Sequence, residues 1–288
     1  ISIISSFSAL NNFDLSSLGQ SETIQFRMSG YFRYYGTVTV DDFVFTTNFY
    51  PGFDVPLAEI SQTLSTGGIQ MNLSDFFGDF HSVNDSLTIQ LENSHIGKNL
   101  ERNKLGHGLA CYGQFSEVQL NNSTIEHHGI DGIHLRTSQS DALVENSIIN
   151  SNFSNGFEVI GSLNLISDSF LIGDNGDNGI DVSQALDWQS DFDVVADNGD
   201  NGVVVGSTLT LVADSLEVVG NFTNGILASG SNSDVTLYQC NLHQNAIGDG
   251  IRLSGVNNAM DIDYSFIRDN GGDGIDMGGS NTLELDNS

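Results

Sequence analysis

A glycine followed by an alternating apolar-x-apolar triplet recurs through most of this sequence. The repetition is plainest where the residues from Asp174 to Val182 return in close copy from Asp197 to Val205. Eight such glycines follow one another at spacings of 23 to 25 residues: Gly108, Gly132, Gly156, Gly179, Gly202, Gly225, Gly250 and Gly274. A fixed period in this range indicates a solenoid, in which each unit buries its apolar face only by stacking on its neighbours.

Each period contains three short segments that alternate like strands. The first is the triplet after the glycine, and the second is a run that ends in Asn or Asp followed by Ser, such as the run from Leu87 to Leu91 before Asn93. Single aliphatic residues mark the third: Ile96, Ile125, Ile148, Leu171, Leu216, Leu242 and Ile267. Period-2 alternation with Gly, Asn and Asp turns, and no leucine-rich-repeat consensus or helical leg, predicts an all-β parallel β-helix with about 24 residues and three strands per coil.

Asparagine occupies the position four or five residues before most of these glycines: Asn103, Asn152, Asn175, Asn198, Asn221, Asn245 and Asn270. Stacked amides can hydrogen-bond from coil to coil, so we interpret these residues as structural. The residues directly before the glycines are His, Asp or Asn, which we expect to adopt the left-handed turn conformation.

The Asn-x-x-x-Gly-apolar coils resemble the pectin-lyase-like superfamily of right-handed parallel β-helices, over roughly residues 82–288. The resemblance implies a right-handed helix whose outer sheet face hosts the active site where the protein is a polysaccharide lyase, hydrolase or epimerase. It is specific for the fold and weak for function.

We divide the chain at residue 81. Residues 82–288 form the β-helix, and its last coil is incomplete because the chain stops at Ser288, in mid-coil. We therefore expect the natural polypeptide to continue, or another chain to cover the open end. Residues 1–81 hold eleven of the eighteen Phe and fit the repeat poorly, so we expect an aromatic-rich N-terminal cap or irregular β coils there.

The composition argues against two classes of binding partner, nucleic acids and membranes. The net charge of -29, with only eight Lys plus Arg, argues against nucleic acid and anionic membranes, and no apolar run is long enough for membrane insertion. Such acidity suits an extracellular or cell-surface setting. Cys111 and Cys240 lie five coils apart, about 24 Å at about 4.8 Å per coil, so both are expected to be free thiols.

The outward residues of the triplets define one column on the solenoid surface, called here the outward column: Ala110, His134, Glu158, Asp181, Val204, Leu227, Arg252 and Asp276. His134, Glu158 and Asp181 are consecutive in it, with Arg136 one pleat further along. A base beside carboxylates and an arginine is suited to abstracting a proton next to a uronate carboxyl, or to two-carboxylate hydrolysis. These four residues are the catalytic candidates, although no polygalacturonase Asn-Thr-Asp or paired-Asp signature is present.

Histidines and basic residues concentrate between Asn93 and Arg136, which contains five of the seven His and four of the eight Lys and Arg. This local group either binds an anionic polymer and supplies acid-base groups, or neutralises neighbouring carboxylates.

The doubled Asp-Asn-Gly-Asp-Asn-Gly turn is a candidate Ca²⁺ site. Its 23-residue offset stacks Asp174 on Asp197 and Asp177 on Asp200, which brings like charges about 5 Å apart beside backbone and amide oxygens. The alternative is a hydrated acidic turn selected for its backbone geometry.

For function, the incomplete last coil, the regular turns and the missing catalytic motif favour an extracellular structural or binding module, such as an adhesin, spike or filament subunit. Its expected partners are copies of itself, other surface proteins, or polysaccharide, with the apolar pair Val204 and Leu227 as one contact strip. The alternative is a polysaccharide-active enzyme, a lyase, hydrolase or epimerase of acidic glycans, on the outer face of the glycine-apolar sheet.

Overall fold

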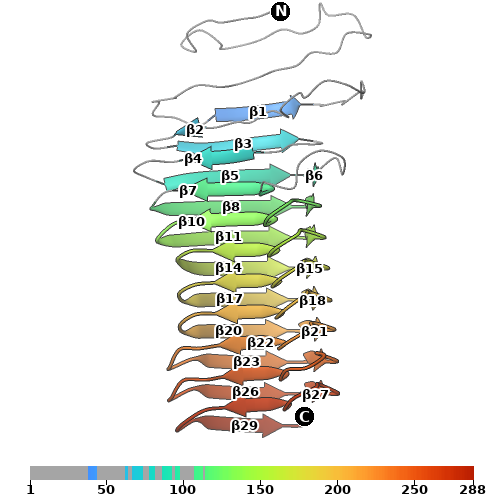
Figure 1. Cartoon of the computed structure of the whole chain (residues 1–288). Coiled ribbons are helices and arrows are strands. Elements are labelled where there is room, and N and C mark those ends of the chain that lie inside the picture. Colours follow the sequence, from blue (N-terminus) through green and yellow to red (C-terminus); the bar gives the residue numbers. More distant parts are fainter. Residues whose placement is uncertain are drawn as a thin grey trace, which may run out of the picture.

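The structure is a computed structural model that describes residues 107–112 and 114–288, together with six earlier strands within residues 38–97. All regular elements in this described part are β-strands, and it contains no helix that could cross a lipid bilayer. Figure 1 shows the strands stacked in layers along one axis, so that the chain rises coil by coil.

The described strands form three parallel sheets. The long sheet has eleven strands: β1 (Val38–Phe43), β3 (Gly67–Leu73), β5 (Ser86–Glu92), β8 (Phe115–Asn121), β11 (Gln139–Glu145), β14 (Ser162–Asp168), β17 (Leu186–Asp191), β20 (Leu209–Asp214), β23 (Asp234–Tyr238), β26 (Ala259–Asp263) and β29 (Thr282–Asp286). The glycine sheet, whose strands follow the repeat glycines, has ten: β2 (Gln62–Thr63), β4 (Gly78–His81), β7 (Leu109–Tyr112), β10 (Ile133–Arg136), β13 (Phe157–Val159), β16 (Ile180–Val182), β19 (Val203–Val205), β22 (Ile226–Ala228), β25 (Ile251–Leu253) and β28 (Ile275–Met277).

The short sheet has eight strands: β6 (His95–Gly97), β9 (Thr124–Glu126), β12 (Ile148–Asn150), β15 (Leu171–Gly173), β18 (Val194–Ala196), β21 (Glu217–Val219), β24 (Asn241–His243) and β27 (Phe266–Arg268). Each strand pairs with the strand one coil away, which confirms the predicted parallel β-helix with three strands per coil. The earliest described strands, β1 to β4, pair in the same way, so the stack extends into residues 38–81.

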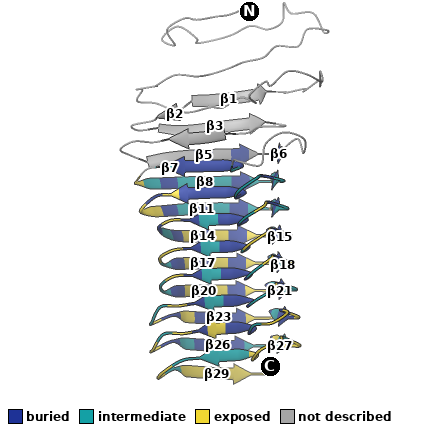
Figure 2. Cartoon of the chain, viewed as in Figure 1, coloured by how far each residue is buried: buried dark blue, intermediate teal, exposed yellow. Residues whose placement is uncertain are grey.

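The core runs through the stack because inward residues repeat at the same register in every coil. In β17, Leu186, Trp188 and Ser190 are buried while the residues between them are exposed, and Figure 2 shows this alternation of buried and exposed positions along the strands. In the short sheet the buried residue is the middle one, such as Ile149 and Ile172. The sequence markers Ile148 and Leu171 lie in their predicted strands, one residue before the buried position, and Leu216 lies one residue before its strand.

The predicted asparagine ladder is confirmed from Asn152 to Asn270. Each Nδ2 donates to the Oδ1 of the next coil, for example Asn175 to Asn198 at 3.0 Å and Asn198 to Asn221 at 2.9 Å, and the backbone N of the same residue donates to that oxygen as well. His128 takes the ladder position in the coil before Asn152 and donates its backbone N to that amide. Asn103 lies outside the described residues.

A second ladder runs through the residues directly before the glycines. Asn178 donates to Asn155 at 3.1 Å and Asn201 to Asn178 at 3.0 Å, and Asp131 stands at the start of this series, where its Oδ1 accepts from Asn155. The expectation that these residues are left-handed was wrong, because the positive φ angles of the same turns fall earlier, on residues such as Ser151, Asp174 and Asp197. The amides before the glycines connect coils instead.

Cys111 and Cys240 are both buried free thiols, as predicted.

Candidate active site

The outward column exists as predicted from the sequence. On the glycine sheet, Ala110 pairs with His134, His134 with Glu158, Glu158 with Asp181 and Asp181 with Val204, and the register continues through Leu227, Arg252 and Asp276. Paired residues of neighbouring parallel strands lie about 4.8 Å apart. Three consecutive coils therefore present an imidazole and two carboxylates as direct neighbours.

His134 is the centre of this group. Its Nδ1 lies 2.5 Å from Glu158 Oε2 and 3.4 Å from Asp131 Oδ2, and only 8% of the residue is exposed. The ring stacks on His107, with centroids 4.3 Å apart, and the Tyr112 ring is 5.7 Å away on another side. Aromatic neighbours and two carboxylates thus fix the plane and position of the imidazole.

Asp131 is nearly completely buried beneath the two histidines, with 1% of the residue exposed. Its Oδ1 accepts from the backbone N and the Nδ2 of Asn155, at 2.9 and 3.2 Å. Burial raises the pKa of this carboxyl, but His107, His134, Glu158 and the backbone N of Asn155 lower it more, so the net pKa is well below the usual range. Asp131 is therefore a fixed buried negative charge.

The environment of His134 favours the imidazolium. Burial lowers its pKa, but hydrogen bonds and charges from Asp131 and Glu158 outweigh that effect and raise the pKa from 6.5 to about 9. Two carboxylates around one imidazole are the reason, because each stabilises the positive form.

Asp181 has the opposite environment. Burial raises its pKa to about 6, the negative charges of Glu158, Asp131 and Asp177 add to the rise, and a hydrogen bond from Asn178 Nδ2 lowers it in part. A carboxyl whose pKa lies near neutral can accept or donate a proton during a reaction.

Arg136, the fourth catalytic candidate, is not brought into this group. It is the exposed last residue of β10, pairs in register with Tyr112, and makes no ion pair with the residues that the structure describes. Lys98, Arg102 and Lys104 of the predicted basic group lie outside the described residues.

The sequence reasoning missed Asp131 as a site residue and interpreted it as a turn residue before a glycine. His107 was counted in the histidine-rich group with possible acid-base roles but was not named as a catalytic candidate. A signal was available, since His107 and Asp131 are 24 residues apart and so stack in consecutive coils, and Asp131 precedes His134 by three residues. Within the described part of the chain, only His107, Asp131 and His134 bring three His, Cys, Asp or Glu ligand atoms within 4.8 Å of one another.

The doubled acidic turn has a different surrounding. Ser154 Oγ donates to Asp177 at 2.9 Å, Thr223 Oγ1 donates to Asp200 at 2.5 Å, and the backbone N of Asp200 donates to the carbonyl of Asp177. Asp174 and Asp197 are exposed and have φ angles of 54° and 55°. The turns of the two coils are stacked. Asp177 accepts from Ser154 in the preceding coil and Asp200 accepts from Thr223 in the following coil. Ca²⁺ binding at these turns stays a prediction.

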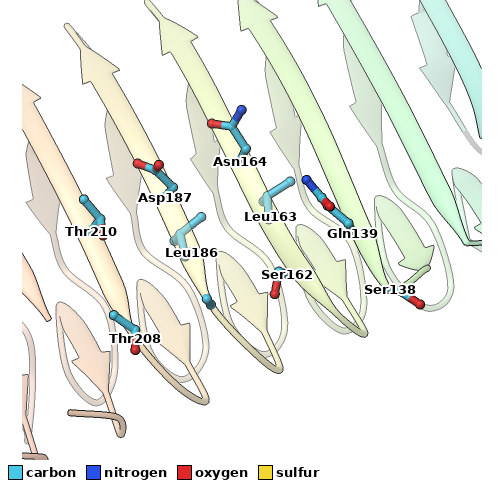
Figure 3. Close-up of a pocket in the computed structure, with 10 residues that line it drawn as sticks. Ser138, Gln139, Ser162, Leu163, Asn164, Leu186, Asp187, Thr208 and Thr210 are labelled. Carbon is cyan, nitrogen blue, oxygen red and sulfur yellow. The ribbon is translucent and has the colours of Figure 1, made fainter. Parts of the chain in front are cut away.

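A separate hollow of about 390 Å³ lies on the long sheet (Figure 3), lined by Ser138, Gln139, Ser162, Leu163, Asn164, Ala185, Leu186, Asp187, Thr208 and Thr210. Figure 3 shows Asn164, Asp187 and Thr210 side by side on adjacent strands. Because its lining has one carboxylate and no other titratable side chain, we place no acid-base chemistry there.

Comparison with known families decides the classification. The model of the family described as "Right handed beta helix region" matches residues 107–288, more than half of the 288 residues. The chain belongs to the right handed beta helix family. The handedness that the resemblance implied is thereby confirmed, and the matched region contains every residue of the site.

Among solved structures, this right handed beta helix protein is similar to the A-module of the mannuronan C-5 epimerase AlgE4 from Azotobacter vinelandii. The two share 14% sequence identity, the similarity covers 89% of this chain and 86% of that chain, and the TM-score is 0.50. At that identity the likeness shows the fold alone. No curated protein matches the sequence.

Proposed function

We propose that this chain is a polysaccharide-active enzyme whose acid-base residues are Glu158 and Asp181, with His134 holding Glu158 in place. The observation that supports it best is the alignment of these three side chains on adjacent strands, with His134 bonded to Glu158 at 2.5 Å. This choice departs from the structural module that the sequence favoured, because the sequence could not show how closely these side chains meet.

The two carboxyl groups differ in the way that acid-base catalysis needs. Glu158 contacts the positively charged His134, whereas Asp181 is half-buried and its pKa lies near 6. A carboxyl whose pKa is raised toward neutral, beside a second carboxyl that an imidazolium holds in place, can serve as the proton donor of such a pair. Glu158 and Asp181 are direct partners on neighbouring strands, whose backbones lie about 4.8 Å apart.

A polysaccharide is the substrate class because the outward column is a straight, repeating surface. Beyond Asp181 it continues through Val204 and Leu227, which are half-buried and apolar and can contact the carbon face of a sugar ring. Acidic glycans come first within that class, since His134 supplies positive charge beside the carboxylates and Arg136 is exposed two residues further along the same strand. The structural neighbour is named for a reaction of a polysaccharide, mannuronan, and adds no support for individual residues.

The test is turnover of a panel of acidic and neutral polysaccharides by the full chain. New reducing ends would report hydrolysis, unsaturated uronate absorbance would report lyase action, and proton NMR would report epimerisation. We expect Glu158→Gln and Asp181→Asn each to lower turnover by roughly 100-fold or more, the usual size of an acid-base contribution. Asp187→Asn is the matched control, because this exposed carboxylate lies on the long sheet. Turnover that survives both changes, or no turnover of any glycan in the panel, contradicts the proposal.

A second candidate function, the structural or binding module at a cell surface, has one observation of its own. Phe153 and Phe222 are 75% and 54% exposed at the same turn position, three coils apart, with Gly176 and Gly199 between them. Exposed aromatic groups on one edge suit lateral contact with another copy. This function predicts concentration-dependent oligomers in sedimentation and electron microscopy that are lost in a Phe153→Ser, Phe222→Ser double variant; a strictly monomeric protein contradicts it.

A further inference from the structure

Three donor atoms converge at the start of the outward column. His107 precedes β7, Asp131 precedes β10, and His134 is the second residue of β10. Asp131 Oδ2 lies 2.9 Å from His107 Nδ1 and 3.4 Å from His134 Nδ1, and the three atoms all lie within 4.8 Å of one another. The same ring nitrogen of both histidines thus faces one carboxylate oxygen.

Two of these atoms are buried without a hydrogen bond to any residue that the structure describes. Asp131 Oδ1 is satisfied by Asn155, but Asp131 Oδ2 and His107 Nδ1 have no hydrogen-bond partner there, although they are close enough for an ion pair. They approach each other without the alignment of a hydrogen bond. The two atoms form an ion pair at 2.9 Å that lacks hydrogen-bond geometry, and a metal ion that takes both as ligands would satisfy them better.

The separations match those of ligands around one small metal ion. Two donors that each bind an ion at about 2.1 Å lie about 3.0 Å apart at a right angle and about 3.4 Å apart at a tetrahedral angle. The measured 2.9 and 3.4 Å fall at these two values. Two imidazoles and a carboxylate are ligands of transition metals, whereas Ca²⁺ and Mg²⁺ take oxygen ligands.

We propose that His107, Asp131 and His134 form a binding site for a divalent transition-metal ion, with Zn²⁺ the best match. Water would complete the coordination, because Glu158 is not among the side chains whose ligand atoms converge there. The Asn155 bonds to Asp131 Oδ1 hold that carboxylate from behind, as outer hydrogen bonds do in known metal sites. The inference goes beyond the proposed function, and its test needs no polysaccharide. A metal ion on His134 Nδ1 would replace the proton that this nitrogen shares with Glu158, so the metal-bound state and the hydrogen-bonded state of His134 are alternatives.

The test is metal binding by the full chain, measured without substrate. After chelator treatment and desalting, the protein is titrated with Co²⁺, followed by visible absorption, and with Zn²⁺, followed by calorimetry. We expect one equivalent of each, and His107→Gln and Asp131→Asn should each weaken the Kd by at least about 100-fold, since even loss of an outer-shell partner costs 10- to 100-fold.

The controls separate binding at these three residues from binding elsewhere on the chain. His243→Gln removes another described histidine that pairs with a carboxylate, Glu217 at 3.2 Å, where no third described ligand joins, and it should leave the Kd unchanged. Circular dichroism and melting of each variant show that folding is kept, and His107→Gln keeps the test valid if Asp131→Asn disturbs its ladder. No binding by the wild type, equal binding by His107→Gln, or binding that is lost only in Asp177→Asn overturns the proposal.

Discussion

Asp193 gives the sharpest prediction for stability, because it is a carboxyl buried completely inside the solenoid. None of the residue is exposed. Ser167 and Ser190 donate their hydroxyls to Oδ2, Phe170 donates its backbone N to Oδ1, and Trp188 Nε1 donates to the Ser167 hydroxyl at 2.7 Å. The change Asp193→Asn keeps the shape and the Oδ1 acceptor but removes the charge.

The magnitude follows from the pKa of Asp193. Burial raises it from 3.8 to about 6, the three hydrogen bonds oppose the rise, and the charge of Asp168 adds to it. Between these two pKa values the folded state binds more protons than the unfolded state, so the free energy of unfolding falls as the pH rises from about 4 to about 7. A shift of two pKa units corresponds to a change of about 2 to 3 kcal/mol in the free energy of unfolding over this pH range.

The assay is denaturant unfolding of the wild type and Asp193→Asn, followed by the fluorescence of Trp188, the single tryptophan of the chain and a direct neighbour of this network. The difference in unfolding free energy between variant and wild type should move by about 2 to 3 kcal/mol in favour of the variant between about pH 4 and about pH 7. Asp181, whose pKa is also near 6, is present in both proteins and cancels. A difference that stays constant with pH refutes the reasoning.

Three further outcomes are expected. Asn198→Ala removes a buried amide that bonds both neighbouring coils, so it should lower the free energy of unfolding by about 2 to 4 kcal/mol in denaturant. The control Asn164→Ala, at an exposed position, should lower it by about 0.5 kcal/mol or less, and equal effects contradict a structural ladder. Gly176→Ala should lower the melting temperature, because its Cβ would clash with the Phe153 carbonyl oxygen, whereas at Gly274 the nearest atom is 3.5 Å away and the same change should be tolerated; similar melting of both variants argues against it. If the acidic turn binds Ca²⁺, chelator should lower the melting temperature of the wild type but not of a variant with Asn in place of Asp174, Asp177, Asp197 and Asp200. A wild-type melting temperature that chelator does not change supports the hydrated turn instead.

The fold and the outward column could be predicted because translation along a solenoid axis is fixed by the period. Once the glycines were aligned, His134, Glu158 and Asp181 had to occupy the same register on consecutive strands, and the pairing agrees. No side-chain geometry is needed for that step, since parallel in-register strands carry equivalent residues to the same place.

The parts that failed depend on local backbone and rotamers. Ile148 marked its strand correctly, but Ile148 and Ile149 are adjacent aliphatic residues, so the pattern left open which one faces inward. The turn residues before the glycines, such as Asn155 and Asn178, suit either a left-handed turn or an amide ladder by composition. Arg136 was grouped with His134 by proximity in sequence, but at the end of β10 its side chain is exposed.

Where the repeat is uninterrupted, it places side chains of like charge at the same position in consecutive coils. Along one edge of the long sheet the register stacks four carboxylates in consecutive coils, Glu145, Asp168, Asp191 and Asp214. Slight desolvation and the negative charges of Asp168 and Asp214 on both sides raise the pKa of Asp191. The three aspartates are exposed to water, which screens their repulsion, so the repeat tolerates them at this edge.

The cluster around His134 differs because there the repeat is broken by residues of another chemistry. Most coils place Asn in the two ladders, but the early coils have His128, Asp131 and His107, and two late coils have Asp249 and Asp273 in the second ladder. A buried Asn would satisfy the coils on both sides at lower cost than a buried charge, and the other buried aspartate of this ladder, Asp249, has a cationic partner in Arg252 at 3.8 Å, so a buried Asp at this position is accounted for by a partner outside the ladder. The Asp131 carboxylate is explained if it pairs with His107 and His134 or binds a metal ion between them. In a protein built from near-identical coils, positions that leave the consensus and then converge in space are therefore the strongest indication of where function lies.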